Sequence, residues 1–473
     1  MAEVIKFPEP DEVLKEKPSI KKYIKYLAFF GPGAIVASVT IGQGQLILGP
    51  QIGAWAHFKL LWLITLSVAS YIIAYVGCRF LLLSGIDMMD MFAVKKRGIL
   101  NWIFILIIFI FVPLFAATIT NTLGQSLQWM IGRGHHLLWG ISFCLLAAIL
   151  AVAGKYKLVE YTQAFFVAVL GIGAVIAVIM IKPDILDILP NFFLIGNIPK
   201  PESWVPSSIA NNIPLIMLGY IGTLTFTIIT ITGYSGWVKV KKWGIFKNKE
   251  NAGSFSQKLF NKFKEEKKIT YLPNDEKEIK KSYTLLKPMI VDIAIAFTIV
   301  AIVSSAYMIA GASLLSEQHK LPTDISLLRE QAVIFSNIAS WLKPLYQISV
   351  FFALFGTVYA GFEAVSRMVY ETSKNVIKRI GKTPYRRFML YFLIYILATG
   401  IPLAIIGSKT VILMLSITLL FIGVIGVIIY GIGAIYMTQT VLPEKYRLGK
   451  AGLAIAIISV VLLILPLFFL FLY

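Results

Sequence analysis

Long apolar stretches alternate with short polar segments along this chain. Ile103 to Phe115 and Leu453 to Tyr473 contain no charged residue, and the second reaches the roughly 20 residues that a helix needs to cross the hydrocarbon core of a bilayer. Similar stretches recur from the first quarter of the chain to its end. Because only helices and closed barrels satisfy their backbone groups in lipid, the pattern predicts an all-α integral membrane protein.

Breakers and charges between the apolar stretches predict eleven membrane-spanning helices. The expected organisation is a segment at 1–26, six helices within 27–234, a basic loop at 235–287 and five helices within 288–473. The individual helices are expected at 27–54, 60–83, 101–131, 137–153, 162–181, 207–234, 288–315, 333–373, 388–407, 410–440 and 451–472.

The distribution of Lys and Arg predicts the orientation of these helices. With the amino terminus inside, 34 of the 44 Lys and Arg fall on the inner side and 8 on the outer side. Such an excess on one side is typical of cytoplasmic loops. We therefore expect a multi-pass protein of the cell membrane with a cytoplasmic amino terminus and an outer carboxy terminus.

Composition agrees with this class of protein. The chain of 473 residues is 58% hydrophobic and 14% charged, which is more apolar side chain than a water-soluble core buries. The net charge of +20 lies mainly in loops on one side, so we expect no nucleic-acid partner. Cys78 and Cys144 both fall in predicted spans, which supports neither a disulfide framework nor a thiolate metal site, and no cofactor is expected.

The basic loop contains a short amphipathic pattern. Its residues 236–287 include 14 Lys and 6 acidic residues. One interpretation is a helix that lies on an anionic membrane surface, and the other, which we favour, is a solvated basic loop with some local packing. The pattern consists of Phe255, Leu259, Phe260 and Phe263 beside Lys258, Lys262 and Lys264.

The first predicted span has a polar centre. Two glycines and two amides occur within Gly42 to Gln45, directly after Thr40. Glycine lets a helix unwind, and freed backbone groups together with Gln43 and Gln45 would bind a solute at the middle of the membrane. The alternative is that the glycines only allow close helix packing and the glutamines bond across helices. We favour the binding site.

The sixth span is also rich in small polar residues. A single threonine in a membrane helix often only bonds a carbonyl one turn back, but a cluster of them favours a lined pocket. Interruptions in the first and sixth helices are expected where two five-helix units repeat with inverted topology. The cluster consists of Gly219, Gly222, Thr223, Thr225, Thr227, Thr230, Thr232 and Gly233.

Several short motifs occur at the predicted spans. They are Gly31-Pro32-Gly33 at the first span, Lys59-Leu60-Leu61-Trp62 at the second, Cys78-Arg79 with Ser84-Gly85-Ile86-Asp87 at its inner end, Gly154-Lys155-Tyr156-Lys157-Leu158 with Glu160 between spans four and five, and Asp292 at the seventh. Together these motifs resemble the Nramp (natural resistance-associated macrophage protein) family of metal transporters, and the likeness covers residues 25–440.

The resemblance implies a LeuT-type fold, a 5+5 inverted repeat plus one extra helix, that works by alternating access between helices one and six. Yet the family's Asp-Pro-Gly-Asn falls on Gly42 to Gln45, and its Met-Pro-His falls near Phe226 to Ile228. The acidic positions of helix three fall on Thr118 and Asn121. The substrate-binding residues implied are Thr40, Gly42, Gln43, Gln45, Thr223, Phe226, Thr227 and Thr230, with Thr118 and Asn121 as coupling or gating candidates.

The chemistry of this site differs from the family's metal site. Amides, hydroxyls and carbonyls replace the thioether and the carboxylate that select transition metals. Losing a carboxylate about 4 Å from a cation forgoes about 4 kcal/mol at an effective dielectric of about 20, or roughly three decades in affinity. The expected cargo is a divalent metal cation that keeps much of its water shell, or alternatively a neutral or anionic small solute. No preferred metal-ligand set follows.

Charged residues inside the spans are few. Glu363, Arg367 and Glu371 are four residues apart on one face of helix eight. They are expected to form a structural ion-pair ladder, although Glu363 and Arg367 are also candidates for coupling or gating because charge within a membrane is costly. Proton coupling is therefore doubtful.

No catalytic motif and no nucleotide-binding loop occurs in the chain, which disfavours an enzyme and an ATP-driven pump. The remaining alternative of another class is a membrane sensor that signals through the basic loop. The sequence therefore favours a secondary transporter.

Overall fold

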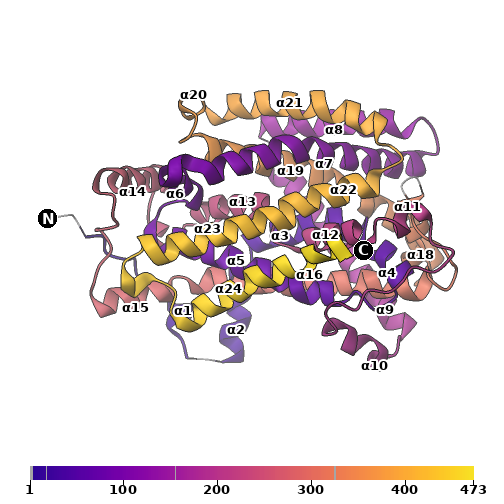
Figure 1. Cartoon of the computed structure of the whole chain (residues 1–473), viewed down its shortest axis with the longest axis horizontal. Helices are drawn as coiled ribbons and strands as arrows, with labels where there is room; N and C mark the ends of the chain where they lie inside the picture. The colour runs from indigo at the N-terminus through magenta and orange to yellow at the C-terminus, as the bar shows by residue number, and fades with distance from the viewer. Residues whose placement is uncertain (1–3, 18, 155, 324–325, 473) are drawn as a thin grey trace.

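The computed structural model describes residues 4–17, 19–154, 156–323 and 326–472; within these ranges the side chains of Gln43, Lys96, 156–163, Leu327 and Leu472 are not described. The described chain is all helical, and most of its long helices run in a common direction (Figure 1). Ten of them are long and apolar enough to cross a membrane, and a bent pair at the amino-terminal end raises the number to eleven. The prediction of an all-α protein with about eleven spans is confirmed.

The first span consists of α3 (Pro32–Thr40), η2 (Ile41–Gln45) and α4 (Gly49–Ala56), and the sixth of α12 (Ile213–Leu224) and α13 (Ile228–Val240). The tenth is α22 (Val411–Leu419), η7 (Leu420–Ile425) and α23 (Gly426–Val441). The other spans are α5 (Trp62–Ser84), α7 (Ile99–Ile131), α8 (His136–Ala153), α9 (Tyr156–Ile181), α16 (Lys287–Leu314), α19 (Lys343–Ser373), α21 (Tyr385–Ile406) and α24 (Lys450–Ile464).

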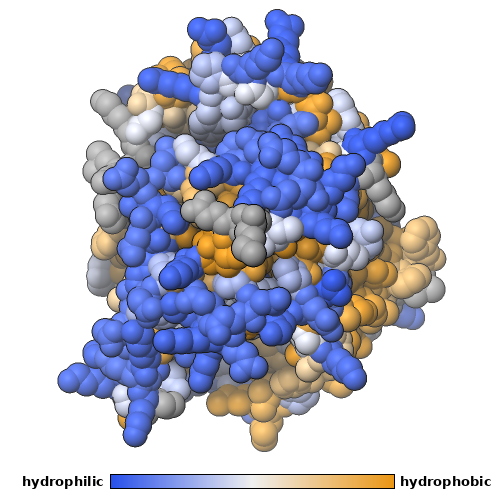
Figure 2. Space-filling model, turned by 90° about the vertical axis from the view of Figure 1, so that its left-hand side faces the viewer, coloured by the Kyte–Doolittle hydropathy of each residue, from blue (hydrophilic) through white to orange (hydrophobic). Residues whose placement is uncertain are grey.

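Short helices cover the two ends of the bundle. At one end lie α6, α14, α15 and α20, and at the other α10, α11 and α18, with the chain termini toward opposite ends (Figure 1). Figure 2 shows that the first end is largely hydrophilic. These helices are α6 (Met88–Val94), α10 (Ile185–Ile188), α11 (Ser207–Ala210), α14 (Ala252–Glu266), α15 (Glu276–Thr284), α18 (Val333–Ser336) and α20 (Lys378–Gly381).

Several predicted helix boundaries are wrong by five residues or more, among them the starts of the first, fifth, sixth and eighth spans. The first span was expected to start at residue 27, but the segment Ile20–Phe29 is bent by 72° from Pro32–Thr40. Gly31, followed by Pro32 at the first helical position, allows the chain to turn before α3 begins. The eighth span was expected from residue 333, but α18 ends at Ser336 and the long helix starts at Lys343.

Close helix packing holds the first span in the bundle. A Cβ atom on Gly53 of α4 would lie 2.1 Å from the carbonyl oxygen of Met308, and one on Gly311 of α16 would lie 2.3 Å from that of Pro50. Small residues on both partners therefore bring the two backbones together, as is common in membranes, where lipid removes the hydrophobic drive for helix association.

The basic loop is folded onto the bundle. Leu259, Phe260 and Phe263 of α14 are all buried, and a Cβ on Gly85 would lie 2.4 Å from a methyl carbon of Leu259. The apolar face of α14 thus packs on protein, in agreement with the local packing favoured from the sequence. Lys258 and Lys264 remain exposed.

Candidate functional site

Helix six unwinds at Thr225–Thr227, and both end residues have extended backbone conformations. The Thr225 hydroxyl lies 2.9 Å from the carbonyl oxygens of Gly222 and Gly423. The Phe226 amide donates to the hydroxyl of Ser70 at 2.9 Å. The Thr227 side chain accepts from the amide of Thr230 at 3.2 Å and so caps α13. The break is therefore held by side chains from its own helix and by a neighbour on α5.

Helix one widens rather than ending at its polar centre. Residues Ile41–Gln45 form a π-helical turn, and the chain then makes a turn before α4 begins. A Cβ on Gly42 would lie 2.5 Å from the Thr357 hydroxyl of α19, and one on Gly44 would lie 2.2 Å from the Thr223 Cβ of α12. Both glycines thus permit close contact between helices, which is the alternative that the sequence left open for them.

Gln45 joins the two interrupted helices. Its side-chain oxygen accepts a hydrogen bond from the Tyr220 hydroxyl of α12 at 2.9 Å, whereas its Nε2 has no partner among the side chains that the structure describes. The side chain is fully buried. A buried amide with an unused donor is costly and is retained where it has another role, which makes Gln45 the strongest candidate among the predicted residues.

A small cavity of about 60 Å³ lies between the first, third, sixth, eighth and tenth spans. This volume accommodates a few water molecules. Its walls are mostly apolar, and the polar side chains on them are Thr227, Thr230 and Thr357. Among the predicted binding residues, Thr227 and Thr230 line this cavity, whereas Thr40, Gly42, Gln45, Thr223 and Phe226 are buried close by without lining it.

Some predicted features lie outside the described residues. These are the side chain of Gln43, Lys155 in the turn between spans four and five, and the side chain of Glu160.

Neither helix-three candidate lines the small cavity. Asn121 donates to the carbonyl oxygen of Ala404 on α21 at 2.9 Å, and its own side-chain oxygen has no partner among the described residues. The Thr118 hydroxyl donates to the carbonyl of Leu114 at 3.0 Å, one turn back on α7. Both residues are buried. Asn121 therefore joins α7 to α21, and Thr118 bonds within α7.

Asp292 ties three spans together. One carboxylate oxygen accepts from the amide of Gly31 at 2.8 Å, and the other accepts from the amide of Gly33 at 2.7 Å and from the Tyr234 hydroxyl at 2.8 Å. The carboxylate thus satisfies the free amides at the amino-terminal end of α3, where the helix dipole also favours negative charge. α16, α3 and α13 meet at this buried side chain.

A larger cavity of about 440 Å³ opens at the end that carries α14. Its lining includes both signs of charge, namely Asp87, Glu250 and Glu371 with Lys239, Lys242 and Arg367.

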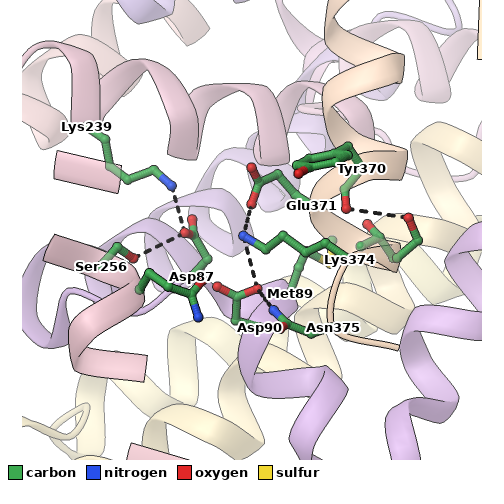
Figure 3. Close-up of polar contacts among 12 residues, drawn as sticks. Asp87, Met89, Asp90, Lys239, Ser256, Tyr370, Glu371, Lys374 and Asn375 are labelled. Atoms are coloured by element: carbon green, nitrogen blue, oxygen red, sulfur yellow. Dashed lines mark hydrogen bonds and ion pairs between the residues drawn. The ribbon is translucent and has the colours of Figure 1, made fainter. Parts of the chain in front are cut away.

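Two groups of ion pairs lie side by side here (Figure 3), and one residue or more of each group lines the larger cavity. Lys239 of α13 pairs with Asp87 at 2.7 Å. Lys374 pairs with Asp90 of α6 at 3.4 Å and with Glu371 at 2.5 Å. Burial raises the pKa of Asp90 to about 7, although the Lys374 ammonium lowers it. Paired charges therefore link α6 to the carboxy-terminal ends of α13 and α19.

The predicted three-residue ladder on helix eight is only half formed. Arg367 Nε donates to Glu363 at 2.9 Å, but Glu371 pairs with Lys374 instead. Lys374 follows Glu371 by three residues and so pairs with it locally, whereas its pair with Asp90 forms because α19 ends beside α6. Arg367 lines the larger cavity, so its position suits either a structural or a gating role.

The donor set does not form a metal site of the usual kind. No group of three or more His, Cys, Asp or Glu side chains converges among the residues that the structure describes. The groups at the two breaks are hydroxyls, one amide and backbone carbonyls. Such neutral oxygen ligands suit a hard cation that keeps its water or an uncharged solute better than a soft transition metal.

Asp90, Lys239 and Lys374 did not emerge from sequence reasoning. Asp90 lies three residues after Asp87, which would have indicated one face of a short helix. The lysines follow the ends of long spans, where a basic residue is expected anyway. Only their contacts with residues on other helices distinguish these three residues from ordinary charged residues at the ends of spans.

Comparison with known proteins adds the following. The family model described as Natural resistance-associated macrophage protein-like matches residues 33–472. A divalent metal cation transporter MntH of Latilactobacillus sakei is 26% identical over 183 residues, and the match covers 37% of this chain and 38% of that relative's length.

Solved structures share the fold. A manganese transporter of Eremococcus coleocola superposes with a TM-score of 0.68 at 13% identity, covering 95% of this chain and 87% of that one. Mhp1, a nucleobase-cation-symport-1 family transporter, superposes with a TM-score of 0.50 at 12% identity over 92% and 90% of the chains. The fold is therefore the LeuT-type arrangement expected from the sequence.

Proposed function

The chain belongs to the natural resistance-associated macrophage protein-like (Nramp) family, and from that premise we propose that it is an alternating-access secondary transporter of a divalent metal cation. The cation keeps much of its water shell. The observation that carries the proposal is the pair of interruptions in helices one and six, which Gln45 and Tyr220 join by a hydrogen bond.

The neutral donor set supports a hydrated cation. A carboxylate at the site would replace water on the ion, whereas hydroxyls and one amide compensate poorly for the loss of hydration. Mg²⁺, which dehydrates reluctantly, fits this chemistry better than Mn²⁺. The relatives named for divalent metal cations and manganese support cation transport.

A second candidate is a neutral or anionic small solute carried by the same mechanism. The specific observation in its favour is the apolar lining of the 60 Å³ cavity, where three threonines supply the polar side chains. Apolar walls with few convergent polar groups are typical of sites for organic ligands. A sensor that signals through the basic loop is the alternative of another class.

Uptake into proteoliposomes distinguishes these functions. We expect Mg²⁺ uptake above that of empty vesicles, with a pH dye inside to register any accompanying proton flux. Gln45→Ala is expected to reduce uptake, and Gln439→Ala is the matched control, since Gln439 donates to the carbonyl of Leu448, distant in sequence from both breaks. Flux of an uncharged solute alone would exclude the cation, and ligand binding without any flux would favour a sensor.

The proposed placement is the cell membrane, with the amino terminus in the cytoplasm and the carboxy terminus outside. The Lys and Arg distribution supports this orientation. A contact of the basic loop with anionic lipid would then run through its exposed lysines, such as Lys258 and Lys264, because the apolar face of α14 packs on protein.

A further inference from the structure

The segment before the first span carries an exposed apolar stripe. It consists of α2 (Ile20–Tyr26) and the turn η1 (Leu27–Phe29). The exposed fractions are 81% for Ile20, 58% for Tyr23, 62% for Ile24 and 59% for Leu27. Their spacing of three, four and seven residues places them on one face of the helix.

The rest of this helix has a different character. Lys22 and Tyr26, on the opposite face, are 6% and 8% exposed. Lys21 and Lys25 flank the stripe and are exposed, although Lys25 also pairs with Glu16 at 2.7 Å. One face is therefore turned to the protein, the other is apolar and bare, and positive charge lies along the boundary.

The orientation of α2 relative to the long helices indicates what covers its exposed apolar face. It is bent by 72° from α3, and α2 stands outside the bundle and runs across the long helices (Figure 1). It is not needed to cross the membrane, because residues 32–56 are long enough to span the bilayer without it. η1 packs against α16, and Ile290 near the start of α16 is 44% exposed.

We propose that α2 is an interfacial anchor that lies on the membrane with Ile20, Tyr23, Ile24 and Leu27 among the upper acyl chains, and that Lys21 and Lys25 bind anionic lipid headgroups. An apolar face flanked by lysines is the composition of helices that lie in the plane of a membrane surface. Because η1 contacts α16, which also exposes the apolar side chain of Ile290, the same leaflet is expected to cover both.

The anchor acts on the first span. The chain from α2 reaches α3 through Phe30 and Gly31, and the Gly31 amide is bonded to Asp292. A helix held at the surface fixes one side of this connection, so movement of α3 has to bend the chain at Gly31 or pull α2 along the membrane. The position of α3 therefore depends on the lipid that holds α2.

Spin labels test the anchor in the full chain in nanodiscs. Labels are placed at Ile24→Cys and, as an exposed control on α15, at Lys277→Cys; Cys78 and Cys144 are buried. Collisional relaxation is measured with oxygen, which concentrates in lipid, and with a water-soluble nickel chelate. We expect the label at 24 to collide at least threefold more with oxygen relative to nickel than the label at 277.

A second experiment varies the charge of the lipid. With phosphatidylglycerol present, the label at 24 is expected to move deeper than in pure phosphatidylcholine, and the combined Lys21→Gln and Lys25→Gln change is expected to abolish that difference. Equal depth in both lipids would overturn the role of anionic headgroups. Equal nickel accessibility at 24 and 277, or protection of 24 from both reagents, would overturn the anchor, the latter because protein then covers the stripe.

Discussion

Replacing Asp292 with Asn should release the amino-terminal end of helix one. The carboxylate accepts three hydrogen bonds, two from amides of Gly31 and Gly33 and one from the Tyr234 hydroxyl. An Asn side chain places an oxygen on one side only, so at least one donor then faces an NH₂ group. That hydrogen bond is lost, and the remaining hydrogen bonds are no longer strengthened by the negative charge of the carboxylate.

The magnitude follows from these contacts. A hydrogen bond to a charged group contributes about 1.5–3 kcal/mol, and the loss of one bond together with the weakening of two others gives about 2–4 kcal/mol. Neutralising a buried carboxylate also removes a desolvation cost. The loss of hydrogen bonds outweighs the relief of this desolvation cost because the amides at the start of α3 are left without an acceptor. We therefore expect local opening of α3 to become roughly 30- to 1000-fold more frequent.

Hydrogen–deuterium exchange of the peptide 31–40 measures this opening in the purified protein. Asp292→Asn should accelerate exchange there by at least 30-fold, and Tyr234→Phe, which removes only the phenol, should do so by about tenfold. Asp184→Asn is the control, since Asp184 is exposed and accepts a hydrogen bond from the amide of Leu186 at the start of α10. Unchanged exchange in a folded Asp292→Asn protein would refute the reasoning.

Three further predictions concern the breaks and the charge network. Gln45→Ala should weaken solute binding by about 1 kcal/mol, roughly fivefold, in concentration-dependent uptake, and unchanged uptake would remove Gln45 from the site. Gly44→Ala should cost about 1–3 kcal/mol because its Cβ would overlap that of Thr223, and it should lower the melting temperature, unlike Gly452→Ala, whose Cβ has no neighbour within 3.6 Å. Because the pKa of Asp90 is raised to about 7 from 3.8, the folded protein binds this proton more tightly than the unfolded chain does. The resulting contribution to the free energy of unfolding is complete below about pH 4 and is lost as the pH rises through 7. The melting temperature of Asp90→Asn relative to the unchanged protein should accordingly rise between pH 5 and 8. A difference in melting temperature that does not change with pH would contradict the raised pKa of Asp90.

The sequence by itself determined the number and order of the spans and the class of fold. Apolar length decides this, because a helix in lipid must be about 20 residues long and nearly free of charge. The polar segments of helices one and six were also visible, since glycine and threonine are conspicuous inside an apolar run. The break in helix six, Thr225–Thr227, overlaps the segment at Phe226 to Ile228 that the family resemblance indicated.

Only the tertiary structure decided which side chains meet. Spacing on helix eight predicted that Glu371 would pair with Arg367, but Glu371 pairs with Lys374 three residues on, and Lys374 also reaches Asp90 because the end of α19 lies beside α6. The amphipathic patterns of α14 and α2 are alike in sequence, yet one apolar face is buried on protein and the other is bare. Periodicity defines a face, whereas the packing of distant segments decides whether protein or lipid covers it.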